Sequence, residues 1–227
     1  MSDTSRPYTV FSDVDETLIT VKSMFDFLHY RLVRLHGAAG EEEYERIMAV
    51  LRRRAADGVP RTEINRAYYR HYAGEDVAAV TALADDWFTE RAASTRGFWI
   101  DSTREALHRH RAAGASVVLV SGSFPPLLEP LAREIGADAV LCTRPLADSG
   151  TYTGEVAVPV IGEGKREAVL AHLASRPDTD PRDCWAYGDH VSDLPMLELV
   201  GHPVAVGDDP ELRERLALRA ETTAAAR

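Results

Sequence analysis

Several acidic and hydroxyl side chains directly follow apolar stretches of this 227-residue chain. Asp13 and Asp15 come after residues 8–12, where aromatic and β-branched side chains predict a short buried strand. Ser121 ends the run "SVVLVS", and Asp189 follows the run "CWAYG". Ligands of an open parallel sheet gather at the carboxyl ends of its strands, so we expect these four side chains to converge on one edge.

The carboxylates at this edge are candidates for holding a hard cation. Neighbouring carboxylates repel each other, and a magnesium ion with oxygen ligands and several retained waters is their natural partner. We expect Asp13, Asp189 and Asp15, the last through its backbone carbonyl, to be metal ligands. Acidic pairs at strand ends are also common without a metal, so this pattern alone does not decide the function.

The segment Ser121-Gly122-Ser123 has the features of an anion-binding turn. It lies between an apolar run and Phe124-Pro125, and proline is tolerated in the first turn of a helix. A serine hydroxyl and free backbone N–H groups at a helix N-terminus suit phosphate oxygens. The alternative is a serine that only caps the turn between a strand and a helix.

Lys165 is expected to need an anionic partner. It follows "GEG" at the start of a predicted helix, where its charge opposes the helix dipole. Bound phosphate or the Asp13 carboxylate would supply the anion, whereas a solvated lysine is the alternative. Asp193 precedes Leu194-Pro195 and is expected to cap the next helix and to hold Lys165. His190 is a candidate substrate contact, with a surface or supporting role as the alternative.

The residue pattern divides the chain into two kinds of segment. Residues 22–95 form long Arg-rich and Ala-rich segments that end at glycines, which predicts an inserted helical domain. Residues 7–21 and 96–219 alternate short apolar runs with helical segments, which predicts an α/β core domain with a parallel sheet covered on both faces. Residues 1–6 and 220–227 are expected to be disordered ends.

Composition limits the partners. The formal net charge is -10, which argues against a general nucleic-acid or anionic-membrane surface. No apolar run approaches the ~18 residues that span a bilayer, and the N-terminus lacks a signal-peptide pattern. We therefore expect a cytoplasmic protein with a small-molecule partner. The sequence does not indicate an oligomeric state.

Four motifs in order resemble the haloacid dehalogenase superfamily, and within it the phosphoserine-phosphatase branch (subfamily IB). They are "DVDET" from Asp13, "VLVSGS" around Ser121, "GEGK" ending at Lys165, and "YGDHVSD" with Asp189 and Asp193. The resemblance implies a Rossmann-like three-layer core with a helical C1 cap inserted after the first motif. It also implies a Mg²⁺-dependent phosphomonoesterase acting on a small phosphorylated metabolite.

The resemblance assigns roles to the motif residues. Asp13 is the nucleophile that forms an aspartyl-phosphate, and Asp15 is the acid and base. Lys165, Ser121 and the metal neutralise the transferred phosphoryl group, with Gly122 and Ser123 as further phosphate contacts. Thr17 is expected to hold the loop of the first motif in place and is counted among the phosphate-binding residues. Asp15 also separates this chain from the dehalogenases, which lack an acid at that place.

Substrate choice is expected to depend on the helical cap. Family members that act on phosphoserine carry a glutamate nine residues after the nucleophile to read the ammonium group, and this chain has Lys22 there. If Lys22 faces the pocket, it repels an amino group, and we expect free phosphoserine to be a poor substrate; a solvated lysine at a helix start is the alternative. Among the arginines that could bind a substrate carboxylate, including Arg61 and Arg70, Arg66 is the preferred candidate because its segment resembles the substrate-reading cap helix.

Two other activities are compatible with the motifs. A phosphotransferase or mutase would pass the phosphoryl group to an alcohol or a sugar instead of water, and a non-catalytic sensor would keep the fold without turnover. Glu16 stands where many family members have glycine, and His190 and Ser192 stand where small or amide residues are frequent. These departures bear on rate and substrate more than on the reaction class.

Overall fold

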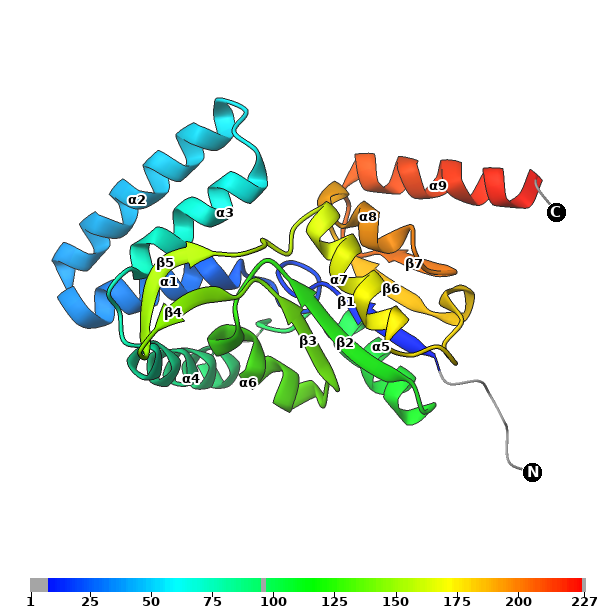
Figure 1. The fold of residues 1–227 in the computed structure, drawn as a ribbon, viewed down its shortest axis with the longest axis horizontal. Helices are drawn as coiled ribbons and strands as arrows, with labels where there is room; N and C mark the ends of the chain where they lie inside the picture. The colour runs from blue at the N-terminus through cyan, green and yellow to red at the C-terminus, as the bar shows by residue number, and fades with distance from the viewer. Residues whose placement is uncertain (1–7, 95–96, 226–227) are drawn as a thin grey trace.

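The alternation predicted after residue 96 forms a parallel sheet in the computed structural model, which describes residues 8–94 and 97–225 (Figure 1). The five strands lie in the order β3-β2-β1-β6-β7, and all neighbouring pairs are parallel. Their bounds are β1 (Thr9–Ser12), β2 (Ser116–Ser121), β3 (Ala139–Cys142), β6 (Trp185–Gly188) and β7 (His202–Ala205). The first strand is therefore central, and its carboxyl end lies between those of β2 and β6.

Helices cover both faces of this sheet, as the burial of alternate strand residues requires. Val10 belongs to the core cluster that contains side chains of α5 (Asp101–Ala112) and α6 (Pro125–Ile135). Phe11, the next residue, belongs to the cluster formed with α7 (Glu163–Ala174), α8 (Leu194–Leu197) and α9 (Pro210–Ala225). The three layers confirm the predicted α/β, Rossmann-like fold.

The segment between β1 and α5 is helical, as its residue pattern predicted. It contains α1 (Ser23–His36), α2 (Ala38–Ala56), α3 (Arg61–Tyr69), the 3₁₀ helix η1 (Arg70–Tyr72) and α4 (Val77–Ser94). Buried aromatic rings hold these helices together and join them to α6; they are Phe27, Tyr68, Tyr69, Tyr72, Trp87 and Phe124. We refer to residues 22–94 as the helical segment.

An antiparallel hairpin lies against the helical segment (Figure 1). It consists of β4 (Pro145–Asp148) and β5 (Thr151–Val156), and its turn has positive φ at both Ser149 and Gly150. Such a turn matches the twist of a two-residue hairpin. The Gly74 N–H donates to the Tyr152 carbonyl at 2.8 Å, and the Val77 N–H to that of Gly150 at 2.9 Å. These bonds connect the hairpin to the start of α4.

Short elements and the chain ends complete the description. Two further 3₁₀ helices, η2 (Pro181–Asp183) and η3 (Val191–Asp193), flank β6. The stretch 1–6 that was expected to be disordered lies outside the described residues, whereas the backbone of α9 continues to Ala225. Within 8–94 and 97–225, the helices are all too short or too polar to cross a bilayer.

Candidate active site

The sheet brings the predicted residues to one edge. Asp13 leaves β1 with its N–H donating to the Tyr187 carbonyl of β6 at 2.9 Å, so the chain is still tied to the sheet there. Lys165 reaches the same point from the first turn of α7. Its Nζ lies 2.5 Å from Asp13 Oδ1 and 2.7 Å from Asp193 Oδ1, and the residue is only 4% exposed. The anionic partner that its position required is therefore a pair of carboxylates.

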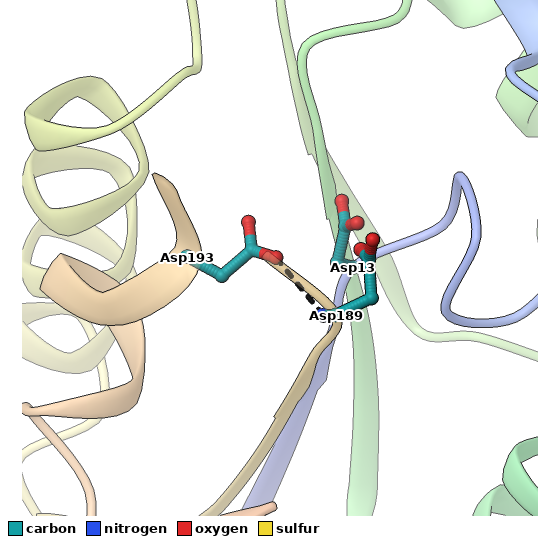
Figure 2. Close-up of side chains that lie close together, drawn as sticks. All are labelled: Asp13, Asp189 and Asp193. Atoms are coloured by element: carbon teal, nitrogen blue, oxygen red, sulfur yellow. Dashed lines mark hydrogen bonds between the residues drawn. The ribbon is translucent and has the colours of Figure 1, made fainter. Parts of the chain in front are cut away.

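Asp193 is positioned by the loop that follows β6. Its Oδ2 accepts the backbone N–H groups of Asp189 and His190, both at 3.2 Å, and Figure 2 shows the bond to Asp189. A Cβ at Gly188 would lie 2.6 Å from the Asp193 Cβ, so this close packing depends on glycine. With one oxygen bound to Lys165 and the other to two N–H groups, Asp193 acts as a support.

Asp13 and Asp189 present oxygens to the same space. The Thr17 hydroxyl lies 2.9 Å from Asp189 Oδ1 and 3.4 Å from Asp13 Oδ2, so Thr17 braces the first loop against the fourth motif. One ligand atom from each of Asp13, Asp189 and Asp193 lies within 4.8 Å of the others (Figure 2). Because Asp193 is already saturated by other donors, Asp13 and Asp189 are the side chains that remain to bind a cation.

The charges of the site favour a cation there. Burial raises the pKa of Asp13, Lys165 opposes that rise, and Asp193 adds to it. Burial and the nearby Asp193 likewise raise the pKa of Asp189. Burial lowers the pKa of Lys165, but Asp13 and Asp193 outweigh it, so the net shift is upward and Lys165 stays charged. The single positive charge of Lys165 does not balance the negative charges of Asp13, Asp189 and Asp193. The carboxylate oxygens of Asp13 and Asp189 fit a magnesium ion.

Asp15 has a different environment from the other acids. Burial raises its pKa to about 6, although hydrogen bonds from Ser23 oppose the rise, and its Oδ1 is buried without a hydrogen-bond partner. Ser23 begins α1, and its hydroxyl lies 3.0 Å from that of Ser123. Sequence reasoning missed Ser23, because its contacts depend on how the helical segment returns to the sheet.

The loop from Ser121 to Ser123 is held from both sides. The Ser123 N–H donates to Ser121 Oγ at 3.1 Å. The Gly122 carbonyl accepts hydrogen bonds from Asn65 Nδ2 at 2.9 Å and from the Tyr69 hydroxyl at 3.0 Å, both on α3. A Cβ at Gly122 would lie 2.8 Å from the Ile161 side chain, so glycine is required for this approach. Asn65 and Tyr69 are further contacts that the sequence did not indicate.

A cavity of about 420 Å³ separates this edge of the sheet from the helical segment. Most predicted site residues line it: Asp13, Asp15, Lys22, Ser121, Gly122, Ser123, Lys165, Asp189, His190 and Asp193. Thr17 is buried behind the two acids that it braces. Lys22 lies in the wall, but its Nζ is 3.1 Å from Glu16 Oε2, so its charge is paired.

The structure does not bring Arg66 into this cavity. Its guanidinium donates to the carbonyls of Val156 at 2.5 Å and Ala157 at 3.0 Å, at the end of the hairpin, and it borders a separate hollow. These carbonyls take the donors that a substrate carboxylate would need. Arg61, at the start of the same helix, borders both this hollow and the cavity, and its Nη1 lies 3.0 Å from His190 Nδ1.

Comparisons with known proteins agree with this arrangement. The family model described as haloacid dehalogenase-like hydrolase matches residues 10–198. A probable phosphatase of Mycobacterium tuberculosis is 35% identical over 147 residues, which are 65% of this chain and 50% of that protein. The chain thus spans about half the length of the curated relatives that it matches first.

Solved structures have the same fold. A protein of unknown function from Bordetella pertussis Tohama I has a TM-score of 0.82 and 25% identity, covering 95% of this chain and 97% of that one. A substrate-bound phosphoserine phosphatase has a TM-score of 0.66 and 20% identity, covering 92% and 90%. The family match extends over most of the chain and confirms the resemblance. This chain belongs to the haloacid dehalogenase-like hydrolase family.

Proposed function

We propose that the chain is a magnesium-dependent phosphomonoesterase that hydrolyses a small phosphorylated metabolite through an aspartyl-phosphate on Asp13. The observation that carries this proposal is the position of the Asp13 carboxylate at the cavity wall, held by Lys165 and adjacent to Asp189. Relatives named as phosphatases support the reaction class.

In the first step, an Asp13 oxygen attacks the phosphorus in line. A bond forms between them, and the bond from phosphorus to the ester oxygen breaks. Asp15 donates its proton to the departing alcohol, a task suited to a carboxyl whose pKa burial has raised to about 6. In the second step Asp15 removes a proton from water, which attacks the phosphorus and releases inorganic phosphate and the Asp13 carboxylate.

Charge stabilisation comes from several groups. Lys165 supplies a buried positive charge, and the Ser121 hydroxyl and the Gly122 N–H bind phosphoryl oxygens, while the Ser123 N–H donates to Ser121 Oγ and holds that hydroxyl in place. Magnesium, held by Asp13, Asp189 and the Asp15 carbonyl, would neutralise further phosphoryl charge when bound.

The helical segment acts as a cap in this proposal. Residues 22–95 form the cap domain and residues 7–21 and 96–219 the core domain, with the cavity between them. The contacts from Asn65 and Tyr69 to Gly122 support coupling between cap position and the phosphate loop. Exclusion of water by such a closure protects the intermediate from side reactions. We place the protein in the cytoplasm, where phosphorylated metabolites occur.

The proposal is tested by phosphate release from a panel of phosphorylated amino acids, sugars, polyols and nucleotides, with Mg²⁺ and with EDTA. We expect activity on at least one compound, its loss in EDTA, and its absence in Asp13→Asn. Alcohol acceptors added to the assay separate hydrolysis from phosphotransfer, since a transferase would form a new ester at the expense of inorganic phosphate. Equal release by Asp13→Asn and by the wild-type protein would contradict the proposal.

A further inference from the structure

The wall that the helical segment contributes to the cavity is largely apolar. Its apolar side chains are Met24, Phe25, Ala55, Val59 and Ile64, and Ile161 continues this surface on the core side. The polar side chains of the same wall are Lys22, Arg61, Asn65 and Tyr68. Hydroxyl and amino groups of a leaving group would lose hydration against the apolar part of this wall, where Asn65 Oδ1 is a buried acceptor without a partner in the protein. The wall therefore favours a leaving group with an aliphatic or aromatic body.

The mouth of the cavity carries one guanidinium without an acidic partner. Lys22 is paired with Glu16, so neither adds net charge. Arg61 also lines the cavity, and within the described part of the chain no carboxylate lies at ion-pairing distance from it. An exposed arginine of this kind has most of its donors available for a carboxylate or phosphate, which it can bind in a fork.

His190 fixes the position of Arg61. The His190 Nδ1 accepts the Ser192 N–H at 3.0 Å, and the imidazole faces Arg61 Nη1 at 3.0 Å and 3.2 Å. This contact joins the start of α3 to the loop that carries Asp189. Arg61 is therefore held over the cavity by a residue of the fourth motif, and its placement is tied to the reacting edge.

We propose that the substrate is a phosphomonoester whose leaving group has an apolar body and an anionic far end that Arg61 binds. This inference rests on the proposed phosphatase function and names its substrate class. The cavity of about 420 Å³ lies in the range that encloses ligands much larger than serine. Glu16 also lines the cavity but is paired with Lys22, so its carboxylate is not free for a substrate ammonium group.

Matched substrates test this assignment. We would measure kcat/KM for ω-carboxyalkyl phosphates, n-alkyl phosphates and ω-aminoalkyl phosphates of four to eight carbons. The distant end group barely changes the chemistry at phosphorus, so differences report binding of that group. Charged hydrogen bonds contribute about 1.5–3 kcal/mol, so we expect the carboxylate to be preferred over the methyl end by ~10 to 100-fold at one chain length. The ammonium end should be the poorest.

In Arg61→Gln, the ratio of kcat/KM for the carboxylate end to that for the methyl end should fall to near one. Arg61→Lys should keep part of this preference. Arg53→Gln is the matched control, because Arg53 lies on α2, is 85% exposed and pairs with Asp57 outside the cavity. It should leave the preference unchanged. Equal kcat/KM for the carboxylate and methyl ends in the wild-type protein, or a preference that survives in Arg61→Gln, would overturn the assignment.

Failure of the phosphatase function would look different. No Asp13-dependent phosphate release would then occur from any of these esters or from p-nitrophenyl phosphate. In that case the end groups would be compared through the dissociation constants of the same esters, measured by calorimetry on the wild-type protein and on Arg61→Gln. A carboxylate preference lost in Arg61→Gln would support the ligand class, and equal dissociation constants would refute it.

Discussion

Lys165 Nζ lies 2.5 Å from Asp13 Oδ1, and this buried pair joins α7 to the end of β1. Asp193 completes the group at 2.7 Å. Removal of one partner from a buried ion pair leaves uncompensated charge and typically costs about 3–5 kcal/mol. We therefore expect Lys165→Met to lower the free energy of unfolding by that amount in urea denaturation, measured without magnesium.

Lys22→Met provides the comparison for Lys165→Met. Lys22 forms a half-exposed ion pair with Glu16, and such surface pairs contribute about 0–1 kcal/mol. If the two variants lost similar amounts of unfolding free energy, the buried contacts of Lys165 with Asp13 and Asp193 would contribute no more to stability than a surface ion pair does.

Glu16 has a left-handed backbone with φ 61°, although its side chain is not that of glycine. This conformation costs a residue with a Cβ roughly 1–2 kcal/mol, part of which glycine loses again as unfolded-state entropy. We expect Glu16→Gly to raise the free energy of unfolding by about 0.5–1 kcal/mol in chemical denaturation. Glu16→Ala also loses the ion pair with Lys22 but keeps the strained backbone, so it should show no gain. A gain of equal size in both would place the effect in the ion pair.

Whether a site residue could be predicted from the sequence depends on whether it lies at the end of a strand or on a helix of the helical segment. Asp13, Ser121 and Asp189 come at strand ends, and parallel pairing brings strand ends together regardless of helix details. Arg66 and Arg61 lie on one helix, and the choice between them depends on the phase of α3 against the hairpin, which only tertiary packing sets. Asn65 contacts Gly122 across 57 residues of sequence, a relation that no local pattern contains.

Magnesium should stabilise the folded protein through Asp13 and Asp189, independently of catalysis. A ligand at 100 times its dissociation constant adds about 2.7 kcal/mol to the stability of the state that binds it. We expect Mg²⁺ to raise the melting temperature of the wild-type protein, and EDTA to reverse the rise. Asp189→Asn should lose most of this shift.

The same variant has an opposite expected effect without metal. Asp189 stands beside Asp193, which contributes to its raised pKa, so neutralising Asp189 removes carboxylate repulsion and should leave the metal-free protein as stable or more stable. Asp57→Asn, at the exposed end of α2, is the control and should keep the full magnesium shift. A magnesium shift that persists in Asp189→Asn would place the ion elsewhere.

Lys22 is expected to exclude phosphoserine from the site. Its ammonium lines the cavity and neutralises Glu16, so a substrate ammonium finds no net negative charge at this wall. Lys22→Glu reverses the charge at this position, and an interaction with a charged group of about 1.5 kcal/mol would raise kcat/KM for phosphoserine roughly tenfold. Lys22→Gln, which only removes the charge, should give a smaller rise. An unchanged kcat/KM in Lys22→Glu would show that Lys22 does not act on the substrate.

His110 should make the stability of the fold depend on pH. Its Nδ1 lies 3.1 Å from the Tyr8 hydroxyl and its Nε2 2.9 Å from the Tyr187 hydroxyl, beside Trp185 and near Arg109 and His202. Burial lowers the His110 pKa, and the charges of Arg109 and His202 lower it further. The unfolded chain therefore binds the proton more tightly than the folded protein does. The resulting stability is complete above the unfolded pKa of about 6.5 and is lost as the pH falls through the folded pKa.

The measurement is the free energy of unfolding of the wild-type protein and of His110→Gln from pH 8 to pH 4.5. Other acids and histidines titrate in both proteins, so the difference between the two curves isolates His110. We expect the wild-type protein to lose more stability than His110→Gln as the pH falls, because the variant lacks the group that prefers to be protonated when unfolded. His108→Gln changes an exposed histidine on the same helix and should follow the wild-type curve. Parallel curves for the wild-type protein and His110→Gln would mean that the two tyrosine contacts accommodate the protonated ring.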